Sequence, residues 1–507
     1  MAPRSGSHAR VSRSCGNCRP IKRRCDRRLP HCGQCIRMRE PCPGYRDEWD
    51  LVFRNQTDHT IKRSKEIRAK RDNKATVARG VHSDPHPSAG FSPNPNEIGV
   101  NYFFHYFVTG CQSSSRGYLN YIPAVWTADG HHPTLVASIA AVGLVTLANT
   151  TRQPTLAKHA RAKYTEAIEQ VNLALASPTE SIKDSTLMSV ISLGLFEHVS
   201  NFVSWARHIQ GAAAVVAARG KCQFATRAAI LMFNQVRADM VAASMYSNQP
   251  FPAELEALQE EAAKYVDTTS VFWRLGVVAT QCTKLLWVVK NNRAESSWLS
   301  LLEQANSLQR ELDQIFVILS TKSPYTIFQK PGGNPAVFYR ERFDLYTNIW
   351  AIRVWNNTRI LQIKVCDAIR YILNHILVSD LNRITQVPLK QKLRDTMKMS
   401  SKLGEDMMAT VPQVLGMVSS ASETVPNIHG SFPTNGSAGY MMTWSLYTAA
   451  KSSVIDYEGR KWIVGRLQDF GHVGGITLAL QLAEDIINFD RCENRESLIL
   501  LSGPFKG

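Results

Sequence analysis

Hydrophobic residues recur at helical spacing through most of the chain beyond residue 98. Apolar positions three or four residues apart are typical of the buried stripe of an amphipathic helix. Alternating strand patterns bounded by tight-turn dipeptides are scarce in the same region. We therefore expect a large all-α domain of ten or more helices. The predicted helices cover residues 135–148, 156–175, 185–198, 203–219, 227–244, 269–289, 296–319, 338–363, 389–411, 440–454 and 476–489.

Turn and loop residues interrupt this helical pattern. Clusters of proline and glycine predict long loops at 323–335 and 425–439. Residues 80–96 contain four prolines and little to bury, which is typical of a flexible linker. We find no internal repeat with the period of a solenoid. The chain before this linker therefore forms a region of its own.

The basic residues are concentrated in that N-terminal region. The 507-residue chain has 59 Lys and Arg against 42 Asp and Glu, a formal net charge of +17. Residues 1–80 hold 21 of the basic and 8 of the acidic side chains, so +13 of the charge lies there. A positive segment on a nearly balanced body indicates a polyanionic partner, either nucleic acid or an anionic membrane surface. A hydrophobic fraction of 44% excludes a wholly disordered or collagenous chain.

No secretory signal is evident, because the first residues lack an apolar stretch. The most apolar segment, 135–148, falls short of the roughly 20 residues that span a bilayer. We expect a soluble intracellular protein with no membrane partner. In a reducing compartment, the 11 cysteines are expected to be thiols or metal ligands instead of disulfides.

Six of the cysteines lie close together with the spacing C-x2-C-x6-C-x6-C-x2-C-x6-C, two copies of one half-motif. A C-x2-C pair can place two thiolates on one metal, as in structural zinc sites. Two tetrahedral zinc ions need eight ligand positions, so six sulfurs suffice only if two of them bridge both metals. One symmetrical arrangement has Cys15 and Cys32, the first cysteine of each half-motif, as the two bridging ligands. The candidate ligands are Cys15, Cys18, Cys25, Cys32, Cys35 and Cys42.

This cysteine-rich segment is too short and too polar to bury a hydrophobic core. Its apolar residues are little more than Ile21, Leu29, Ile36 and Met38. Zinc binding is therefore expected to supply its folding free energy. We expect a small metal-stabilised zinc cluster domain, then a basic segment with a flexible linker, then the all-α domain, at 1–45, 46–97 and 98–507.

The chain between the second and third cysteines carries four cations within six positions, 19–24. Pro20 suits the first turn of a short helix. A short cationic helix fits the major groove of DNA, which is about 12 Å wide, and Lys and Arg side chains pair there with guanine O6 and N7. The candidate DNA-binding residues are Arg19, Lys22, Arg23 and Arg24.

Residues 15–42 resemble the fungal six-cysteine, two-zinc binuclear cluster of transcription factors. The resemblance rests on the six cysteines, the basic run after the second, Asp26 after the third, and Pro30 before the fourth. It implies a module that binds two zinc ions and reads a CGG-like triplet in the major groove, usually as a dimer on paired half-sites.

The resemblance also assigns roles to the cations by position. Lys22 matches the principal base-reading cation, and Arg19, Arg23 and Arg24 match base-adjacent or phosphate-contacting positions. Ile21 departs from the family, in which Lys or Arg is frequent at that position. The residues that the basic run singles out are thus the residues that the resemblance assigns to DNA.

The cysteine cluster has two alternative interpretations. A disulfide-bonded knot requires an exported chain, and no secretory signal is evident. A zinc site used only for contact with protein leaves the basic run without a role. Four further cations are expected to contact phosphates or solvent instead of bases: Arg27, Arg28, Arg37 and Arg39.

The segment after the cluster carries two further features. Residues 43–54 resemble a stretch that follows the cluster in one branch of the family. No heptad pattern continues to residue 75, so a long coiled coil is not evident. The chain is then either a monomer or a dimer formed by the C-terminal domain, and the sequence leaves both alternatives open. The cations of 62–79 fit a nuclear-import signal, additional phosphate contacts or a solvated helix face.

Two aromatic patterns resemble the helical regulatory region that accompanies this cluster in many fungal regulators. They are Trp205-x2-His208-x2-Gly211-Ala212, ending at 219–220, and Trp444-x2-Tyr447-x-Ala449, followed by Arg460-x-Trp462. Aromatic anchoring and close helix packing account for both patterns without a ligand.

Sequence signatures of catalysis are missing. The chain has no H-E-x-x-H, no G-x-x-x-x-G-K-[ST], no G-x-S-x-G, and no G-x-G-x-x-G after a strand. His208 is expected to be a packing residue. The remaining cysteines are expected to be buried small hydrophobes: Cys111, Cys222, Cys282, Cys366 and Cys492. We therefore expect a protein that is not an enzyme.

The sequence favours a nuclear, sequence-specific regulator of genes transcribed by RNA polymerase II, bound to double-stranded DNA as a homodimer or heteromer. About three base pairs cannot select one site among ~10⁶ or more genomic competitors, so a second subunit or a partner is needed. By resemblance, such regulators often control a metabolic pathway or a secondary-metabolite gene cluster, and the helical domain responds to a small-molecule effector. The alternative is an interaction protein whose zinc module binds protein, or binds nucleic acid without sequence preference.

Overall fold

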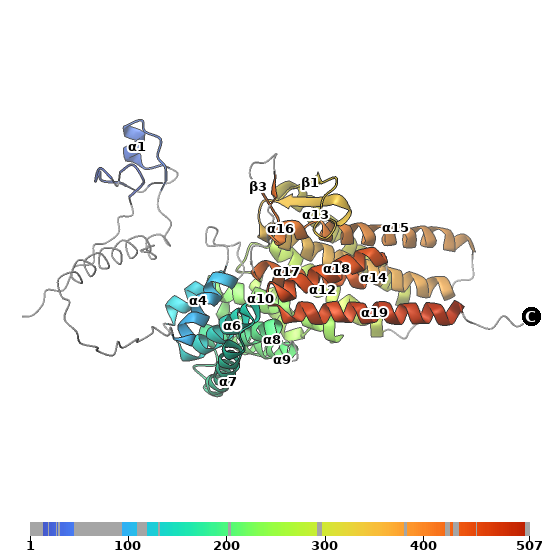
Figure 1. The fold of residues 1–507 in the computed structure, drawn as a ribbon, viewed down its shortest axis with the longest axis horizontal. Coiled ribbons are helices and arrows are strands. Elements are labelled where there is room, and N and C mark those ends of the chain that lie inside the picture. Colours follow the sequence, from blue (N-terminus) through green and yellow to red (C-terminus); the bar gives the residue numbers. More distant parts are fainter. Residues whose placement is uncertain are drawn as a thin grey trace, which may run out of the picture. The chain divides into compact units, whose positions relative to one another are not determined.

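The computed structural model of the protein has two compact units. The smaller unit lies within residues 14–44 and the larger within 94–501, and Figure 1 colours both along the sequence. The described residues are 14–18, 20–26, 28, 31–44, 94–108, 119–129, 132–200, 204–291, 297–379, 383–420, 426–428, 436–452 and 454–501. Most of the predicted linker and the basic segment at 62–79 lie outside these residues.

Among the described residues of the smaller unit there is one short helix, α1 (Gly33–Arg37), which begins after Cys32. The Cys32 Sγ accepts a hydrogen bond from the Cys35 N–H at 3.3 Å. The sequence predicts a short helix that begins near Pro20. That prediction is wrong for the described residues, because residues 20–22 form a turn. Lys22 has a left-handed φ of 51°, which ends a right-handed turn before it can become a helix.

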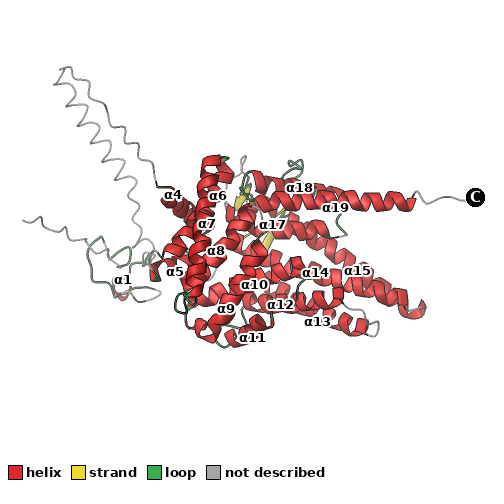
Figure 2. Ribbon diagram, turned by 90° about the horizontal axis from the view of Figure 1, so that it is seen from below, coloured by secondary structure: helices red, strands yellow, loops and turns green. Residues whose placement is uncertain are grey.

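The larger unit is mainly helical, as the sequence predicts (Figure 2). Its N-terminal half contains α4 (Pro95–Phe107), α5 (Ile122–Ala128), α6 (Pro133–Thr151), α7 (Pro154–Ala176), α8 (Asp184–Ser200), α9 (Trp205–Arg219), α10 (Arg227–Ser247) and α11 (Ala253–Ala262). Its C-terminal half contains α12 (Val271–Asn291), α13 (Trp298–Lys322), α14 (Ile349–Ser379), α15 (Arg383–Met408), α16 (Val411–Val414), α17 (Gly436–Lys451), α18 (Tyr457–His472) and α19 (Thr477–Leu501). Each predicted helical range except 338–363 overlaps one of these helices closely.

The predicted helix at 338–363 is wrong before residue 349. Residues Arg342–Tyr346 form strand β2, which pairs antiparallel with β1 (Tyr325–Gln329). Arg340 and Glu341 have positive φ values of 51° and 61°, which interrupt a helix, and β2 then pairs with β1 instead. A second short pair joins β3 (Val418–Ser420) to β4 (Pro426–Ile428).

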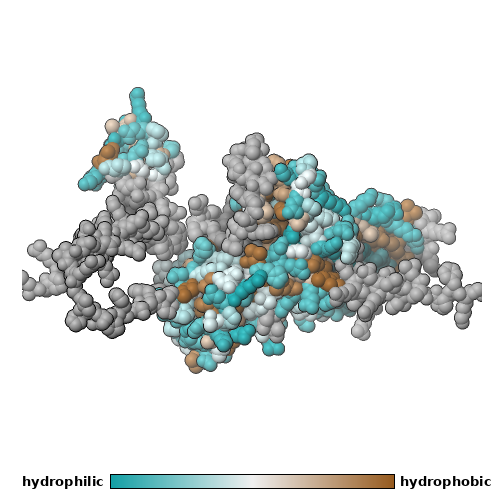
Figure 3. All heavy atoms as spheres, viewed as in Figure 1, coloured by the Kyte–Doolittle hydropathy of each residue, from teal (hydrophilic) through white to brown (hydrophobic). Residues whose placement is uncertain are grey.

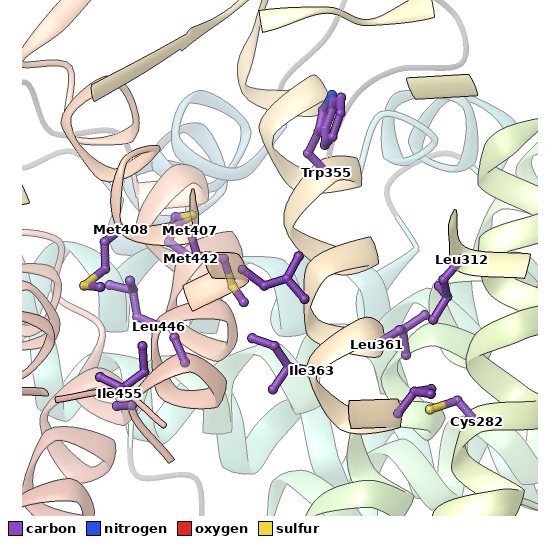
Figure 4. Packing of buried hydrophobic residues seen from close by; sticks show 14 of the residues in the cluster. Cys282, Leu312, Trp355, Leu361, Ile363, Met407, Met408, Met442, Leu446 and Ile455 are labelled. Carbon is purple, nitrogen blue, oxygen red and sulfur yellow. The ribbon is translucent and has the colours of Figure 1, made fainter. Parts of the chain in front are cut away.

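Two large hydrophobic cores fill most of the larger unit, and a third, smaller cluster lies beside β2 and β3. The first core is formed by buried residues from α4 to α11 and Trp273, and the second core by buried residues from α12 to α19. In Figure 4 the long helix α14 lies at the centre of the second core, with Leu361 near Leu312 and Cys282 on one side and Ile363 toward Met442 on the other. The two cores meet at Met245, Ala279 and Trp444, which pack against both.

Helix α6 is long and apolar enough by composition to cross a membrane, but 72% of that stretch is buried inside the larger unit. It packs against α4, α7 and α8. Figure 3 shows hydrophilic side chains over most of the visible face of the larger unit, with scattered hydrophobic patches between them. The apolarity of α6 is thus accounted for by core packing.

The crossing of α4 and α6 depends on two glycines. A Cβ added at Gly143 would lie 1.8 Å from the Gly99 carbonyl oxygen, and one added at Gly99 would lie 2.5 Å from the Ala140 carbonyl oxygen. Both neighbours are backbone atoms, which cannot rotate away. The two helix backbones therefore approach too closely for any side chain at these positions.

Gly143→Ala is expected to lower the free energy of unfolding of the larger unit by ~1 to 3 kcal/mol, the usual cost of overpacking a core. The midpoint of thermal unfolding, followed by circular dichroism, should fall by several degrees. Gly465→Ala is the matched control, because a Cβ at this α18 position meets no atom within 4 Å and alanine favours the helix. Equal midpoints for Gly143→Ala and the wild type would contradict the close crossing.

Candidate metal centre and nucleic-acid interface

Four sulfurs form the centre of the smaller unit. The Sγ atoms of Cys15, Cys18, Cys32 and Cys35 are buried and lie within 4.8 Å of one another. Cys15 Sγ lies 3.6 Å from Cys32 Sγ and 3.7 Å from Cys35 Sγ, and Cys18 Sγ lies 3.8 Å from Cys32 Sγ. A tetrahedral zinc with bonds of about 2.3 Å places its sulfurs about 3.8 Å apart. The sulfur spacing therefore fits zinc.

The remaining two cysteines flank this centre. Cys25 and Cys42 are half-buried and pack against the four sulfurs. The Cys25 Sγ lies near Cys32 Sγ and accepts a hydrogen bond from the Cys15 N–H at 3.5 Å. Cys15 and Cys32 each lie against sulfurs from the opposite half of the motif. The structure thus brings all six predicted ligands together.

The two half-motifs have matching backbone geometry, related by a shift of 17 residues. The Arg23 N–H donates to the Cys18 carbonyl at 2.9 Å, and the Glu40 N–H donates to the Cys35 carbonyl at 3.0 Å. Lys22 and Arg39, which precede these donors, are both left-handed, with φ values of 51° and 56°. Each C-x2-C pair is therefore followed by the same closed turn, with a cation at its corner.

Contacts between the halves fix their relative position. The Asp26 carboxylate accepts a hydrogen bond from the Gly33 N–H at 2.9 Å, which lowers the pKa of Asp26. A Cβ at Gly33 would lie 2.6 Å from this carboxylate, so the position favours glycine. Asn17 Nδ2 also donates to the Pro41 carbonyl at 2.9 Å. These polar contacts therefore hold the two half-motifs together, as a hydrophobic core does in a larger domain.

The thiols resist ionisation where they are packed together without a cation. Burial, together with the adjacent sulfurs of Cys15 and Cys32, raises the pKa of the Cys18 thiol to about 12. Burial and neighbouring sulfurs also raise the pKa of Cys35. Hydrogen bonds from the backbone of Cys32 and Gly44 lower the pKa of Cys42 to about 7. A cluster of thiolates at neutral pH therefore needs metal ions at its centre.

The predicted DNA-binding cations differ in their surroundings. Lys22 and Arg24 are exposed, whereas Arg23 is half-buried. The Arg23 guanidinium donates to both carboxylate oxygens of Glu40, at 3.1 and 3.3 Å. Arg19 lies outside the described residues. Sequence reasoning missed Glu40 as a partner of Arg23, although the 17-residue offset places the two at equivalent positions of the half-motifs.

The aromatic patterns of the larger unit meet in space. The rings of Trp205 and Trp444 lie 5.9 Å apart, and both pack in the cores, which confirms their prediction as packing anchors. His208 Nε2 lies 2.8 Å from the Tyr164 hydroxyl, which confirms a satisfied packing histidine.

The cysteines outside the cluster follow the expectation only in part. Cys282 and Cys366 are buried as predicted. Cys222 is exposed, and the prediction of burial is wrong there because it lies in a short 3-10 turn (Gly220–Ala225) after α9. The side chains of Cys111 and Cys492 lie outside the described residues.

Comparison with known families agrees with this geometry. Residues 13–50 match the fungal Zn(2)-Cys(6) binuclear cluster domain, and residues 91–316 match the fungal specific transcription factor domain. No curated protein and no solved structure matches the chain. The protein is therefore a DNA-binding transcription regulator of the fungal type. Both matched domains indicate a regulatory, non-enzymatic role.

The chain belongs to the fungal transcription factors that combine a binuclear zinc cluster with a helical regulatory domain. Its N-terminal domain binds two zinc ions, and the six cysteines that the structure brings together are the residues available to hold them. The zinc ions supply the cations that the packed thiolates require. Proteins of this class act in the nucleus.

The apparent affinity for zinc is expected to fall as the pH is lowered from 7.5 to 6.5. Cys18 and Cys35 have raised pKa values, so both thiols must release protons when zinc binds. Each released proton changes the apparent affinity by about tenfold per pH unit, so these two thiols alone contribute about a hundredfold, and every further ligand thiol that releases a proton adds to this. Competition between the full chain and a chromophoric zinc chelator measures this change.

Cys222→Ser is the matched control for this measurement, since Cys222 is exposed and lies outside the cluster. Its pH dependence should equal that of the wild type. A zinc affinity that is the same at both pH values would show that the thiols are already ionised before the metal binds.

Proposed function

We propose that the protein reads a CGG-like triplet of double-stranded DNA with the cations of residues 19–24. The observation that carries this proposal is the exposure of Lys22 at the corner of a turn between Cys18 and Cys25. Cysteines on either side of the turn fix its backbone once zinc is bound. Lys22 is the proposed base-reading residue, because a cation in a fixed position can select guanine O6 and N7.

The neighbouring cations have supporting roles in this proposal. Arg24 is exposed and is proposed to contact phosphate or an adjacent base, as is Arg19. Arg23 has the same assignment, but a phosphate must compete with Glu40 for its guanidinium. Arg23 is therefore expected to contribute less to binding than Lys22 does.

All six cysteines are the proposed zinc ligands, with Cys15 and Cys32 as the bridging pair. The proposed domain limits are 1–45 for the cluster, 46–97 for the basic segment and linker, and 98–507 for the regulatory domain. Family membership supports control of a metabolic or secondary-metabolite gene cluster transcribed by RNA polymerase II, with a small-molecule effector acting on the regulatory domain. No membrane partner is part of this proposal, because the apolar helix α6 is mostly buried inside the larger unit.

Lys22→Ala is expected to weaken binding to a duplex with CGG-like triplets by ~1 to 3 kcal/mol. Binding to a random duplex should change much less, because Lys22 is proposed to contact bases. Arg39→Ala is the matched control: Arg39 has the equivalent left-handed position in the second half-motif and is expected to contact phosphate or solvent. Fluorescence anisotropy at near-physiological salt measures both affinities.

The control variant should weaken binding to both duplexes by similar factors. If Lys22→Ala also lowers both affinities equally, sequence reading by Lys22 is contradicted. That outcome would favour the second candidate function, a zinc module that binds nucleic acid without sequence preference.

Two subunits are expected on each functional DNA site, since one cluster reads too few base pairs to be selective. Sedimentation of the full chain with a duplex that carries two triplets should show a complex of two chains, or of one chain with a partner factor. One monomer that binds tightly and specifically to a single triplet would contradict this expectation.

A further inference from the structure

A cavity of about 420 Å³ lies in the larger unit where the two hydrophobic cores meet. The three residues that pack against both cores, Met245, Ala279 and Trp444, all line it. Cavities of this size are typical of sites for small organic ligands. The cavity is partly open at the surface of the domain, so a ligand from solution can enter it.

Four helices present regular stripes of residues to the cavity. On α14, Arg353, Asn357, Ile360 and Lys364 recur at helical spacing, and all four are half-buried. Helices α10, α12 and α17 each contribute a comparable stripe. Regular elements therefore position the walls of the cavity, as expected for a site that exists before its ligand arrives.

Aromatic rings form one wall. The Trp444 ring lies 5.9 Å from the Trp205 ring, 5.8 Å from the Tyr246 ring and 6.0 Å from the Tyr447 ring. Tyr246 is 53% exposed, so this wall reaches the surface of the domain. Such a wall suits a flat ring system that stacks on aromatic side chains.

The charges around the cavity are mainly positive. Arg237, Arg353, Lys364 and Lys451 line it, against Asp239 as the single carboxylate among the described lining residues. Arg237 already donates to the Gln259 side chain, and Lys451 pairs with Asp485. Lys364 forms no ion pair within the part of the chain that the structure describes, although its charge acts on the Asp367 carboxyl of the same helix. The lining therefore favours an anion, with Lys364 as the available partner.

One polar group in the wall lacks a hydrogen-bond donor. Asn234 is 6% exposed, and its Oδ1 accepts no hydrogen bond from the described residues. A buried acceptor is normally paired, because leaving it without a donor is unfavourable. Asn234 lines the cavity, but its Oδ1 has almost no accessible surface, so a ligand with an O–H or N–H group supplies the missing donor only when this side chain turns toward the cavity.

We propose that this cavity binds a small organic acid that combines a flat apolar ring system, one carboxylate or equivalent anionic group, and an O–H or N–H donor. The rings stack on the wall around Trp444, the anionic group pairs with Lys364, and the donor reaches Asn234 Oδ1 once that side chain turns toward the cavity. A ligand in this position contacts both cores of the domain and stabilises their junction. Only the role of this ligand as an effector rests on the proposed function.

The probe for this site is 8-anilinonaphthalene-1-sulfonate, which has two ring systems, an N–H group and one negative charge. Its uncharged counterpart, N-phenyl-1-naphthylamine, has the same rings and the same N–H group. Fluorescence titration of the zinc-loaded full chain, without DNA, should show one bound probe per chain. The charged probe should bind about tenfold more tightly than the neutral one.

Lys364→Met should weaken binding of the charged probe about tenfold and leave binding of the neutral probe unchanged. Lys398→Met is the matched control, because Lys398 is an exposed lysine on α15 and should affect neither probe. Ala279→Phe should fill the cavity and abolish binding of both probes. If Ala279→Phe does not fold, the comparison of the two lysine variants still decides the question.

Equal affinities for the charged and neutral probes, or a Lys364→Met variant that binds the charged probe like the wild type, would overturn the proposal. Because the titration contains no DNA, its result does not depend on Lys22. Failure of the Lys22 experiment would overturn sequence reading and leave this binding site intact. Failure here would remove the site and leave the DNA-binding proposal intact.

Discussion

The close packing of six cysteine sulfurs is the constraint on which the N-terminal domain depends. Its segment has almost no apolar core, and closely packed thiolates repel one another unless cations lie among them. Zinc therefore supplies both the folding free energy and the fixed positions from which the polypeptide turns back. The contacts of Asp26 with Gly33 and of Arg23 with Glu40 then orient the two halves, and Lys22 lies exposed at the corner that results.

The regulatory domain is stabilised in a different way. Its two hydrophobic cores meet at a partly open junction, with cations and aromatic rings around a cavity. The matched family region, 91–316, contains the first core and only the beginning of the second. Helices α14 and α17 complete the walls of the cavity from outside that region. A ligand there would connect the two parts of the domain, which is a physical basis for a response to a small molecule.

Sequence patterns predicted most features that depend on local spacing. The cysteine spacing predicted the sulfur cluster, and helical periodicity predicted most of the long helices. Features that depend on distant residues escaped prediction: the pairing of β2 with β1, the Arg23–Glu40 ion pair, and the contact between Trp205 and Trp444. Four helices were not predicted: α4, α5, α11 and α18. The apolar stripes of α11 and α18 are short and interrupted by charged residues. The cavity was not predicted for the same reason as the distant contacts, because residues from five helices that are separated in the sequence line it.

The most direct test of the account is selection of bound sequences from a random DNA pool by the zinc-loaded full chain. Near-physiological salt keeps contacts to phosphate from dominating the selection. The account predicts enrichment of CGG-like triplets, and their spacing would report how the subunits are arranged. A chain that carries two zinc ions and binds DNA, yet enriches no sequence, would contradict the claim that the cluster selects its site.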